Sequence, residues 1–293
     1  MPQATNNDVT LEYETFGDPA DPAVLLIMGF TAQMIAWPDE LCERFVAAGR
    51  YVIRFDNRDC GLSSKTDAAP LNFLLMAAAV AEGRDIGQVP YTLSDMAADA
   101  VAVLDAAGVE RAHVVGASMG GMITQVMAVE HPHRVATMTS IMSTTGDRNV
   151  GQATPDAMAA LVGAPATDRE GAIEASLKAA RIFGGPLIDE EVVRERAGAA
   201  FDRSFHPAGA PFQMAAITKT GDRTEALRGV EHRALVIHGR ADTLIAPSGG
   251  EATAEAIPNS TLLMLDEMGH SLPPLLWDQV VSAIVDHSSG EVA

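Results

Sequence analysis

Short runs of apolar or alternating residues recur along the chain. They are separated by longer stretches in which apolar residues return every three or four positions. The short runs predict strands, and the longer stretches predict helices that bury one face. The expected strands are residues 10–16, 23–27, 51–55, 112–115, 135–142, 234–238 and 261–265. Because strands alternate with helices, we expect an α/β fold with a mostly parallel central sheet and helices on both faces.

Sequence signals for the ends of helices are found at some of the expected helices. Pro38, Thr92 and Ser248 stand where helices are expected to begin, and a closing helix is expected to include residues 275–285. Thr92 with Asp95, and Ser248 with the glutamate three residues later, have the spacing of a capping box. Residues 64–90 show no clear period and are expected to form an irregular segment.

The pattern changes between residues 144 and 229. Several helical pieces are interrupted there by prolines, and no strand is expected. We interpret this segment as a helical cap inserted into a core domain made of residues 1–143 and 230–293. The carboxyl ends of parallel strands meet at one edge of a sheet, where binding sites form. A cap that enters after such a strand can cover that edge.

The segment around Ser118 runs from an expected strand through a turn into an expected helix. The turn, Gly116-Ala117-Ser118-Met119-Gly120, has the sequence G-x-S-x-G. Its glycines leave room where strand and helix approach, and a strained turn exposes the serine oxygen. The start of the helix also favours developing negative charge. The pattern predicts that Ser118 is a catalytic nucleophile.

A serine nucleophile needs a base and an acid. With strands in this order, the three residues are expected along the chain as Ser, then Asp or Glu, then His. Asp242 follows the second-to-last expected strand, and His270 follows the last one beside a glycine. We expect His270 to take the Ser118 proton and Asp242 to orient the imidazole. Asp147 is the alternative acid and His238 the alternative base, although most of the eight histidines are expected to be structural.

Two backbone N–H groups should hold the negative oxygen that forms during acyl transfer. Met119, directly after the nucleophile, is expected to supply one. Phe30, in the loop after the strand 23–27, is expected to supply the other, and Gly29 allows that loop to be tight. An ordinary glycine turn is the alternative interpretation. Such a site needs no metal ion and no organic cofactor.

Composition and charge narrow the functional classes. The chain has 293 residues, of which 47% are hydrophobic, so a large core can form. Its formal net charge is −19, with 39 acidic and 20 basic residues. A phosphate-binding surface needs clustered basic groups, so this balance argues against nucleic acid and anionic membranes as partners.

Cysteine content and the start of the sequence bear on its location. Cys42 and Cys60 are the two cysteines, too few for a disulfide framework, which favours a reducing compartment. We expect Cys42 to be a small buried side chain on a helix. The sequence does not open on a basic stretch followed by an apolar run, and no segment reaches the about 18 apolar residues of a membrane span. We therefore expect a cytoplasmic protein without a membrane partner.

These motifs together resemble those of the α/β-hydrolase family, over nearly the whole chain outside the expected cap. The resemblance is carried by Met28-Gly29-Phe30, Asp56-x-Arg58-x-x-Gly61-x-Ser63, Gly116-Ala117-Ser118-Met119-Gly120, Gly239-x-x-Asp242 and Gly269-His270. Residues 17–22, 37–40, 58–61 and 111–116 are further similar to the aclacinomycin methylesterase-like subgroup. Members of that subgroup cleave a methyl ester on a polyketide antibiotic. The resemblance implies an esterase with a helical cap.

Two positions depart from the family pattern. Many members carry histidine where this chain has Met28, which puts the hydrogen bonding of the loop in doubt but leaves its backbone donor in place. Asp59 stands where many members carry glycine. We expect Asp59 to form a local salt bridge with Arg58, and a substrate contact is the alternative.

The leading hypothesis is a serine esterase that acts on a small-molecule ester, either a small to medium apolar one or an aromatic, polyketide-type one. Apolar side chains of the expected cap suggest its pocket, with core packing as the alternative: Met158, Phe183, Phe201, Phe205, Phe212 and Met214. The same triad suits carbon–carbon bond hydrolysis of a dienoic ketone, or perhydrolysis. A non-catalytic ligand-binding protein on the same scaffold is the alternative from another class. The sequence does not identify the natural substrate or the oligomeric state, and a homo-oligomer is possible.

Overall fold

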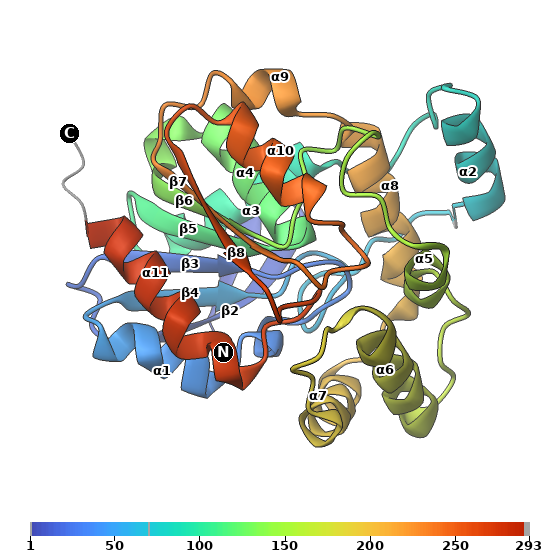
Figure 1. The fold of residues 1–293 in the computed structure, drawn as a ribbon, viewed down its shortest axis with the longest axis horizontal. Coiled ribbons are helices and arrows are strands. Elements are labelled where there is room, and N and C mark those ends of the chain that lie inside the picture. Colours follow the sequence, from blue (N-terminus) through green and yellow to red (C-terminus); the bar gives the residue numbers. More distant parts are fainter. Residues whose placement is uncertain (1, 70, 290–293) are drawn as a thin grey trace.

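One twisted sheet runs through the molecule (Figure 1). The computed structural model describes residues 2–69 and 71–289, and across them the sheet has eight strands in the order β1-β2-β4-β3-β5-β6-β7-β8. The strands are β1 (Gln3–Asn6), β2 (Val9–Phe16), β3 (Ala23–Ile27), β4 (Tyr51–Phe55), β5 (Ala112–Ala117), β6 (Val135–Ile141), β7 (Ala234–Gly239) and β8 (Ser260–Leu265). β1 and β2 pair antiparallel, as do β2 and β4, and all other neighbours pair in parallel. The predicted α/β class with a mostly parallel sheet is confirmed.

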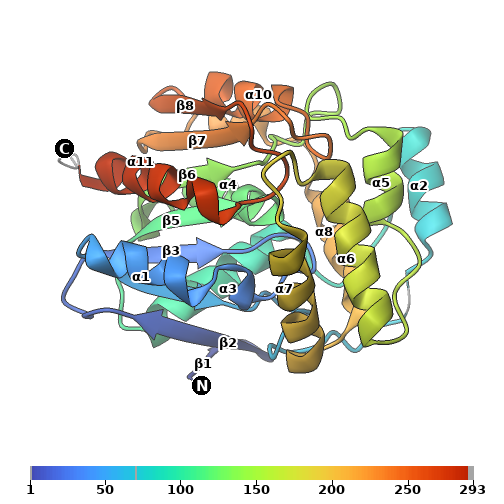
Figure 2. The same ribbon diagram turned by 60° about the horizontal axis from the view of Figure 1, so that its bottom comes forward.

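Helices cover both faces of this sheet (Figures 1 and 2). The helices are α1 (Asp39–Ala47), α2 (Phe73–Ala81), α3 (Leu93–Ala106), α4 (Met119–Glu130), α5 (Pro155–Leu161), α6 (Arg169–Phe183), α7 (Glu190–Arg203), α8 (Ala210–Thr220), α9 (Thr224–Leu227), α10 (Ser248–Ala256) and α11 (Trp277–Ser289). Short 3₁₀ turns lie at Met34–Ala36, Pro132–Arg134, Pro207–Gly209 and Pro274–Leu276. α1 and α11 pack on one face, and α3, α4 and α10 pack on the other.

Alternate residues of β3 enter two separate hydrophobic layers. Leu25 and Ile27 belong to the layer that contains apolar residues of α3 and α4. Val24 and Leu26 belong to the layer that contains apolar residues of α1 and α11. Successive side chains of a strand point to opposite faces, so a strand covered on both faces favours apolar residues at every position. This is why β3 has no polar position.

Two elements were not expected from the sequence. β1 has the polar sequence Gln-Ala-Thr-Asn and pairs with β2 at the sheet edge, so it carries no apolar run. α2 lies inside the segment 64–90, where the prediction of irregular structure is wrong. Its residues are nearly all apolar, which hides any helical period, and the Asn72 side chain caps it by accepting the Leu75 N–H at 3.1 Å.

The two predicted capping boxes have different outcomes. Asp95 accepts the backbone N–H of Thr92 at 2.8 Å, so the box at the start of α3 is confirmed. The box at Ser248 is wrong, because Pro247 is the N-cap of α10 and Ser248 is already helical. The Ser248 hydroxyl instead accepts the N–H of Gly151 at 3.0 Å.

The segment between β6 and β7 is helical throughout its regular structure, as expected. Its helices α5 to α8 lie beyond the carboxyl ends of the parallel strands (Figure 2). Phe212 and Ala216 of α8, with Leu227 of α9, pack in the same hydrophobic layer as α3 and α4. The division of the chain into a core and a separate cap at residues 144–229 stays a prediction.

The described residues bear on membrane insertion and on metal binding. None of their helices combines the length and the apolar character needed to cross a lipid bilayer. No group of three or more His, Cys, Asp or Glu side chains in this part of the chain could hold a metal ion.

His113 in β5 is expected to make the fold less stable as the pH falls. Its side chain is buried and its Nδ1 lies 2.9 Å from Thr137 Oγ1. Burial, and then the charge of Arg50, lowers the pKa of His113 to about 4. Above about pH 6.5, the usual pKa of an unfolded histidine, both states are neutral. Between there and pH 4 only the unfolded state gains the proton, so roughly 2–3 kcal/mol of the free energy of unfolding is lost as the pH falls.

Urea unfolding at pH 7 and pH 4.5 tests this expectation. A His113→Gln variant should lose less stability between the two values than the wild type, whatever its stability at pH 7. His133→Gln, at an exposed histidine, is the matched control and should retain the wild-type decline. Parallel declines in wild type and His113→Gln would contradict the assignment.

Candidate active site

The junction of β5 and α4 places Ser118 in an unusual backbone conformation. Its φ is 57° and its ψ is −120°, which residues with a side chain rarely adopt. Ser118 is partly exposed, whereas Ala117 and Met119 on either side are buried. The turn therefore presents the serine hydroxyl outside the packed interior, as the sequence motif predicts.

Close backbone contacts explain the glycines of this turn. A Cβ atom on Gly116 would overlap the carbonyl of Gly120, and one on Gly120 would overlap the carbonyl of Ile27 at the end of β3. The Ser143 hydroxyl, just after β6, donates to the Ser118 carbonyl oxygen at 2.8 Å. Three strand ends thus hold the turn in place.

Ser118, His270 and Asp242 lie in one line of hydrogen bonds. Ser118 Oγ is 2.9 Å from His270 Nε2, and His270 Nδ1 is 2.7 Å from Asp242 Oδ2. The side chains of His270 and Asp242 are 9% and 0% exposed. In this arrangement an imidazole can take the hydroxyl proton while the carboxylate stabilises the imidazolium.

Both carboxylate oxygens of Asp242 are occupied. Oδ1 accepts the backbone N–H groups of Leu244 and Ile245, each at 2.9 Å. Oδ2 is left to face the imidazole of His270. The tight loop after β7 therefore fixes which oxygen meets the histidine.

The end of α6 supports the histidine loop. His270 N–H donates to the Phe183 carbonyl at 2.6 Å, and the Ser271 hydroxyl donates to the Gly184 carbonyl at 2.6 Å. The Phe183 ring meets the His270 ring edge-on, with centroids 5.9 Å apart. Sequence patterns gave no signal for this support, because it joins segments 87 residues apart.

The alternative base and acid lie in other surroundings. His238 is fully buried, and its Nε2 lies 2.8 Å from the Ile245 carbonyl and 3.6 Å from Asp242. Burial lowers the pKa of His238, which keeps the ring neutral behind the acid. Asp147 accepts the backbone and side-chain N–H groups of Asn149 in its own loop. Both side chains have the contacts of structural residues.

The loop after β3 lies directly against Ser118. A Cβ atom added to Gly29 would be 2.9 Å from Ser118 Cβ and 3.4 Å from its Oγ. The Asn57 side chain donates to the Met28 carbonyl at 2.8 Å. The loop is therefore braced through its backbone, although the usual histidine is replaced by Met28. Phe30 directly follows Gly29 in this loop, so its backbone N–H lies one residue from the point of contact with Ser118.

Asp56 connects this loop to its surroundings. The fully buried carboxylate accepts the backbone N–H groups of Met34 and Leu62, each at 2.8 Å. It also pairs with Arg203 Nη1 of α7 at 2.7 Å. The Ser63 hydroxyl donates to the Asp56 carbonyl at 2.6 Å. The Asp56-x-Arg58-x-x-Gly61-x-Ser63 motif thus braces the loops beside the site.

The predicted salt bridge between Arg58 and Asp59 is wrong. Arg58 instead forms a bidentate salt bridge with Asp99 of α3. Its Nε donates to Oδ2 at 2.6 Å and its Nη2 donates to Oδ1 at 2.7 Å. Asp59 has a φ of 65° and accepts the Tyr91 hydroxyl at 2.6 Å and both the N–H and the hydroxyl of Thr66. The turn at Asp59 therefore directs its carboxylate to Tyr91 and Thr66 and not to Arg58.

Neither cysteine is suited to act as a nucleophile. Cys42 and Cys60 are free and buried, and burial raises the pKa of each thiol to about 12. The reactive form of cysteine is the thiolate, which is negligible at neutral pH under these conditions. Cys42 is a small buried side chain on α1, as expected.

The apolar side chains expected in a cap pocket separate into different roles. Phe183 contacts His270, and the rings of Phe201 and Phe205 pack on each other with centroids 4.6 Å apart. Phe212 is 4% exposed within the layer beside α3 and α4, and Met158 is 45% exposed. Core packing therefore accounts for Phe212.

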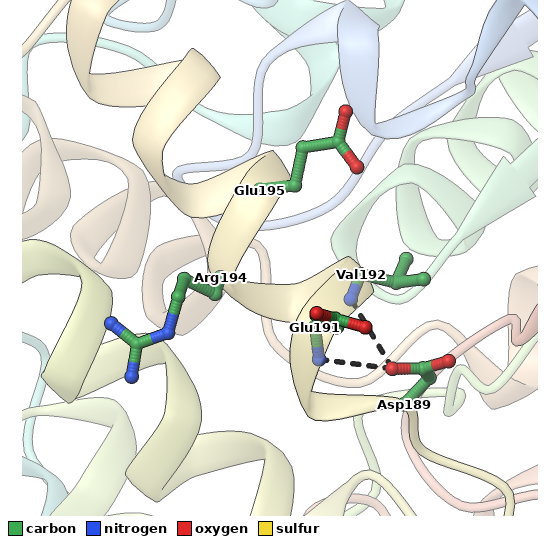
Figure 3. Close-up of a pocket in the computed structure, with 5 residues that line it drawn as sticks. All are labelled: Asp189, Glu191, Val192, Arg194 and Glu195. Atoms are coloured by element: carbon green, nitrogen blue, oxygen red, sulfur yellow. Dashed lines mark hydrogen bonds between the residues drawn. The ribbon is translucent and has the colours of Figure 1, made fainter.

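Two surface pockets are lined by residues other than Ser118, Asp242 and His270. One, of 410 Å³, is at the start of α7 (Figure 3), where Asp189 accepts the N–H groups of Glu191 and Val192 as a helix cap. Its lining is charged and exposed. The other, of 570 Å³, lies between α8 and the loop after β6 and includes Met122, one turn after Ser118.

The chain is similar in sequence to a protein family and to proteins of known activity. A family model described as the alpha/beta hydrolase fold matches residues 22–274. Rhodomycin D methylesterase DnrP of Streptomyces peucetius is 31% identical over 97% of this chain and 96% of its own length. A 2-hydroxymuconate semialdehyde hydrolase of Pseudomonas putida is 26% identical over 66% of each chain.

Solved structures have the same overall fold. The esterase RhEst1 from a Rhodococcus species superimposes with a TM-score of 0.76 at 21% identity, over 100% of this chain and 99% of its own. The meta-cleavage product hydrolase CumD of Pseudomonas fluorescens gives a TM-score of 0.74 at 20% identity, over 97% and 96%. At these identities the likeness concerns the fold alone.

Proposed function

The chain belongs to the alpha/beta hydrolase family and is a carboxylic-ester hydrolase, and we propose that it acts through a Ser118 acyl-enzyme. The observation that carries this proposal is the line of hydrogen bonds from Ser118 through His270 to Asp242. A serine hydroxyl is a weak nucleophile until an adjacent base accepts its proton. The geometry supplies that base and a buried carboxylate behind it.

In the proposed reaction, Ser118 Oγ attacks the ester carbonyl as its proton passes to His270 Nε2. The backbone N–H groups of Met119 and Phe30 stabilise the resulting oxyanion, helped by the start of α4. His270 returns the proton to the departing alcohol, which leaves an acyl-enzyme. A water molecule then gives a proton to His270 Nε2 and attacks the acyl carbonyl carbon. The bond from that carbon to Ser118 Oγ breaks, the acid leaves, and His270 returns the proton to Ser118 Oγ. No step requires a metal ion or an organic cofactor.

The proposed substrate is a small-molecule ester with an apolar or aromatic, polyketide-type acid part. The similarity to a rhodomycin D methylesterase over 97% of the chain supports a methyl ester. The segment 144–229 is proposed to cap the carboxyl ends of the strands, and the contact between Phe183 and His270 supports an apolar wall there.

Carbon–carbon bond hydrolysis is the second candidate. The resemblance to a 2-hydroxymuconate semialdehyde hydrolase over 66% of the chain favours it. Both reactions would use the same serine and histidine. The substrate pocket, and not the triad, therefore decides which reaction takes place. The methylesterase covers more of the chain at higher identity, which is why ester cleavage is preferred.

A substrate panel combined with active-site labelling tests the proposal. Nitrophenyl and methyl esters of short and aromatic acids should be hydrolysed faster than a dienoic ketone. A fluorophosphonate probe should modify the peptide that contains Ser118, as read by mass spectrometry. Faster cleavage of the ketone would favour the second candidate, and no labelling with no turnover would contradict both.

A further inference from the structure

We propose that Gln213 of α8 is a positioning residue that holds the loop carrying the Phe30 amide in its working geometry. The inference rests on the proposed function, because it concerns the amide that would stabilise the oxyanion. Gln213 is 0% exposed and lies 182 residues from the loop residue that it contacts. It belongs to the helical segment outside the family motifs.

Both ends of the Gln213 amide are engaged. The Thr31 N–H donates to Gln213 Oε1 at 2.7 Å, and Gln213 Nε2 donates to the Arg58 carbonyl at 2.9 Å. A reversed amide would place donor against donor and acceptor against acceptor, so this orientation is fixed. One buried side chain therefore joins the loop after β3 to the loop after β4.

The loop that Gln213 contacts is a turn with a demanding conformation. Ala32 N–H donates to the Gly29 carbonyl at 3.2 Å, which makes Phe30 and Thr31 the two central residues of a four-residue turn. Thr31 has a φ of 58°. A positive φ at the third position is typical of a type II turn, where glycine or asparagine is usual. Threonine is β-branched and rarely adopts it.

An outside partner is therefore needed to keep this turn. Type I and type II turns differ by rotation of the peptide between the two central residues, here Phe30 and Thr31. The Gln213 carbonyl binds the N–H of that peptide and so selects one rotation. The Phe30 N–H belongs to the preceding peptide, so its position depends on the whole turn keeping its shape against Ser118, which the loop touches through Gly29. Without the Gln213 bond the strained turn can relax, and the Phe30 N–H then shifts with it.

The expected consequence is specific to the chemical step. The oxyanion exists in the tetrahedral intermediate and not in the bound ester, so a displaced donor lowers kcat more than it raises KM. A Gln213→Leu variant should lose about 10- to 100-fold in kcat, less than complete removal of an oxyanion donor. Its KM should stay within about threefold, and its affinity for a trifluoromethyl ketone should fall by the same factor as kcat.

Thr220 offers a matched control on the same helix. Its hydroxyl accepts the backbone N–H of Leu93 at 3.0 Å, which also joins α8 to the core, at the start of α3. A Thr220→Val variant should keep kcat within about twofold, since it leaves the oxyanion donors in place. If Gln213→Leu does not fold, Gln213→Met, with an unbranched side chain of similar length, replaces it.

A rescue experiment separates positioning from packing. Glycine adopts a positive φ without strain, so Thr31→Gly should restore at least about fivefold of kcat to Gln213→Leu. Equal kcat for Gln213→Leu and Thr220→Val, or no recovery in the double variant, would overturn the proposal. If the wild-type protein neither cleaves esters nor takes the fluorophosphonate label, the proposed function fails instead.

Discussion

Replacement of Ser118 by alanine is expected to lower kcat for a short nitrophenyl ester by about 10⁵- to 10⁶-fold. The hydroxyl is the proposed nucleophile, and no acyl-enzyme can form without it. The variant should fold normally, because the Ser118 side chain is partly exposed and the turn is held by its backbone. Initial rates with the nitrophenyl ester, together with thermal melting, measure both expectations.

Ser140 provides the control for this substitution. It lies on β6, is buried, and its hydroxyl has no hydrogen-bond partner among the described residues. Ser140→Ala should therefore leave the rate within about threefold of the wild type, as expected for a site outside the chemistry. Ser118→Ala with at least a tenth of the wild-type rate would show that the ester is cleaved elsewhere.

An Asp242→Asn variant is expected to lose about 10⁴-fold in kcat near neutral pH. The N–H groups of Leu244 and Ile245 bind Oδ1, so the asparagine carbonyl must take that place. Its NH₂ group then faces His270 Nδ1 and donates to it. The ring proton is forced onto Nε2, which can no longer accept the Ser118 proton.

Both kcat and the melting temperature of the variant are measured. The melting temperature should stay close to the wild-type value, because the change is nearly isosteric. Asp266→Asn is the matched control, since Asp266 is exposed and pairs with Arg240 at the surface. Such exposed pairs contribute little, so its kcat and stability should stay close to the wild type. A loss of less than tenfold in Asp242→Asn would argue against the tautomer role of the acid.

Hydrophobic pattern alone located most of the sheet. β3 and β4 have the predicted bounds because both are fully buried; β3 is apolar throughout, and β4 is apolar except for Arg54, which pairs with Glu14 and Asp39. β1 was missed, because a polar edge strand becomes a strand only by pairing with β2. α2 was missed for the opposite reason, since a nearly all-apolar segment has no period to detect.

A local motif and chain order together selected the three aligned side chains. Ser118 follows from a local motif, and Asp242 and His270 follow from their places after the last two strands. The wrong pairing of Arg58 with Asp59 shows the limit of this reasoning. Adjacent opposite charges suggest a bond, but the turn at Asp59 and the buried Asp99 decide the actual partners.

The sequence by itself determined the fold class, the order of the strands along the chain and the candidate nucleophile, because each depends on local pattern or on topology rules. The tertiary structure decided the distances from Ser118 to His270 and Asp242. It also decided the supports at Phe183 and Gln213. Those supports join segments that are far apart in sequence, and a hydrogen bond across such a separation depends on packing that no local pattern records.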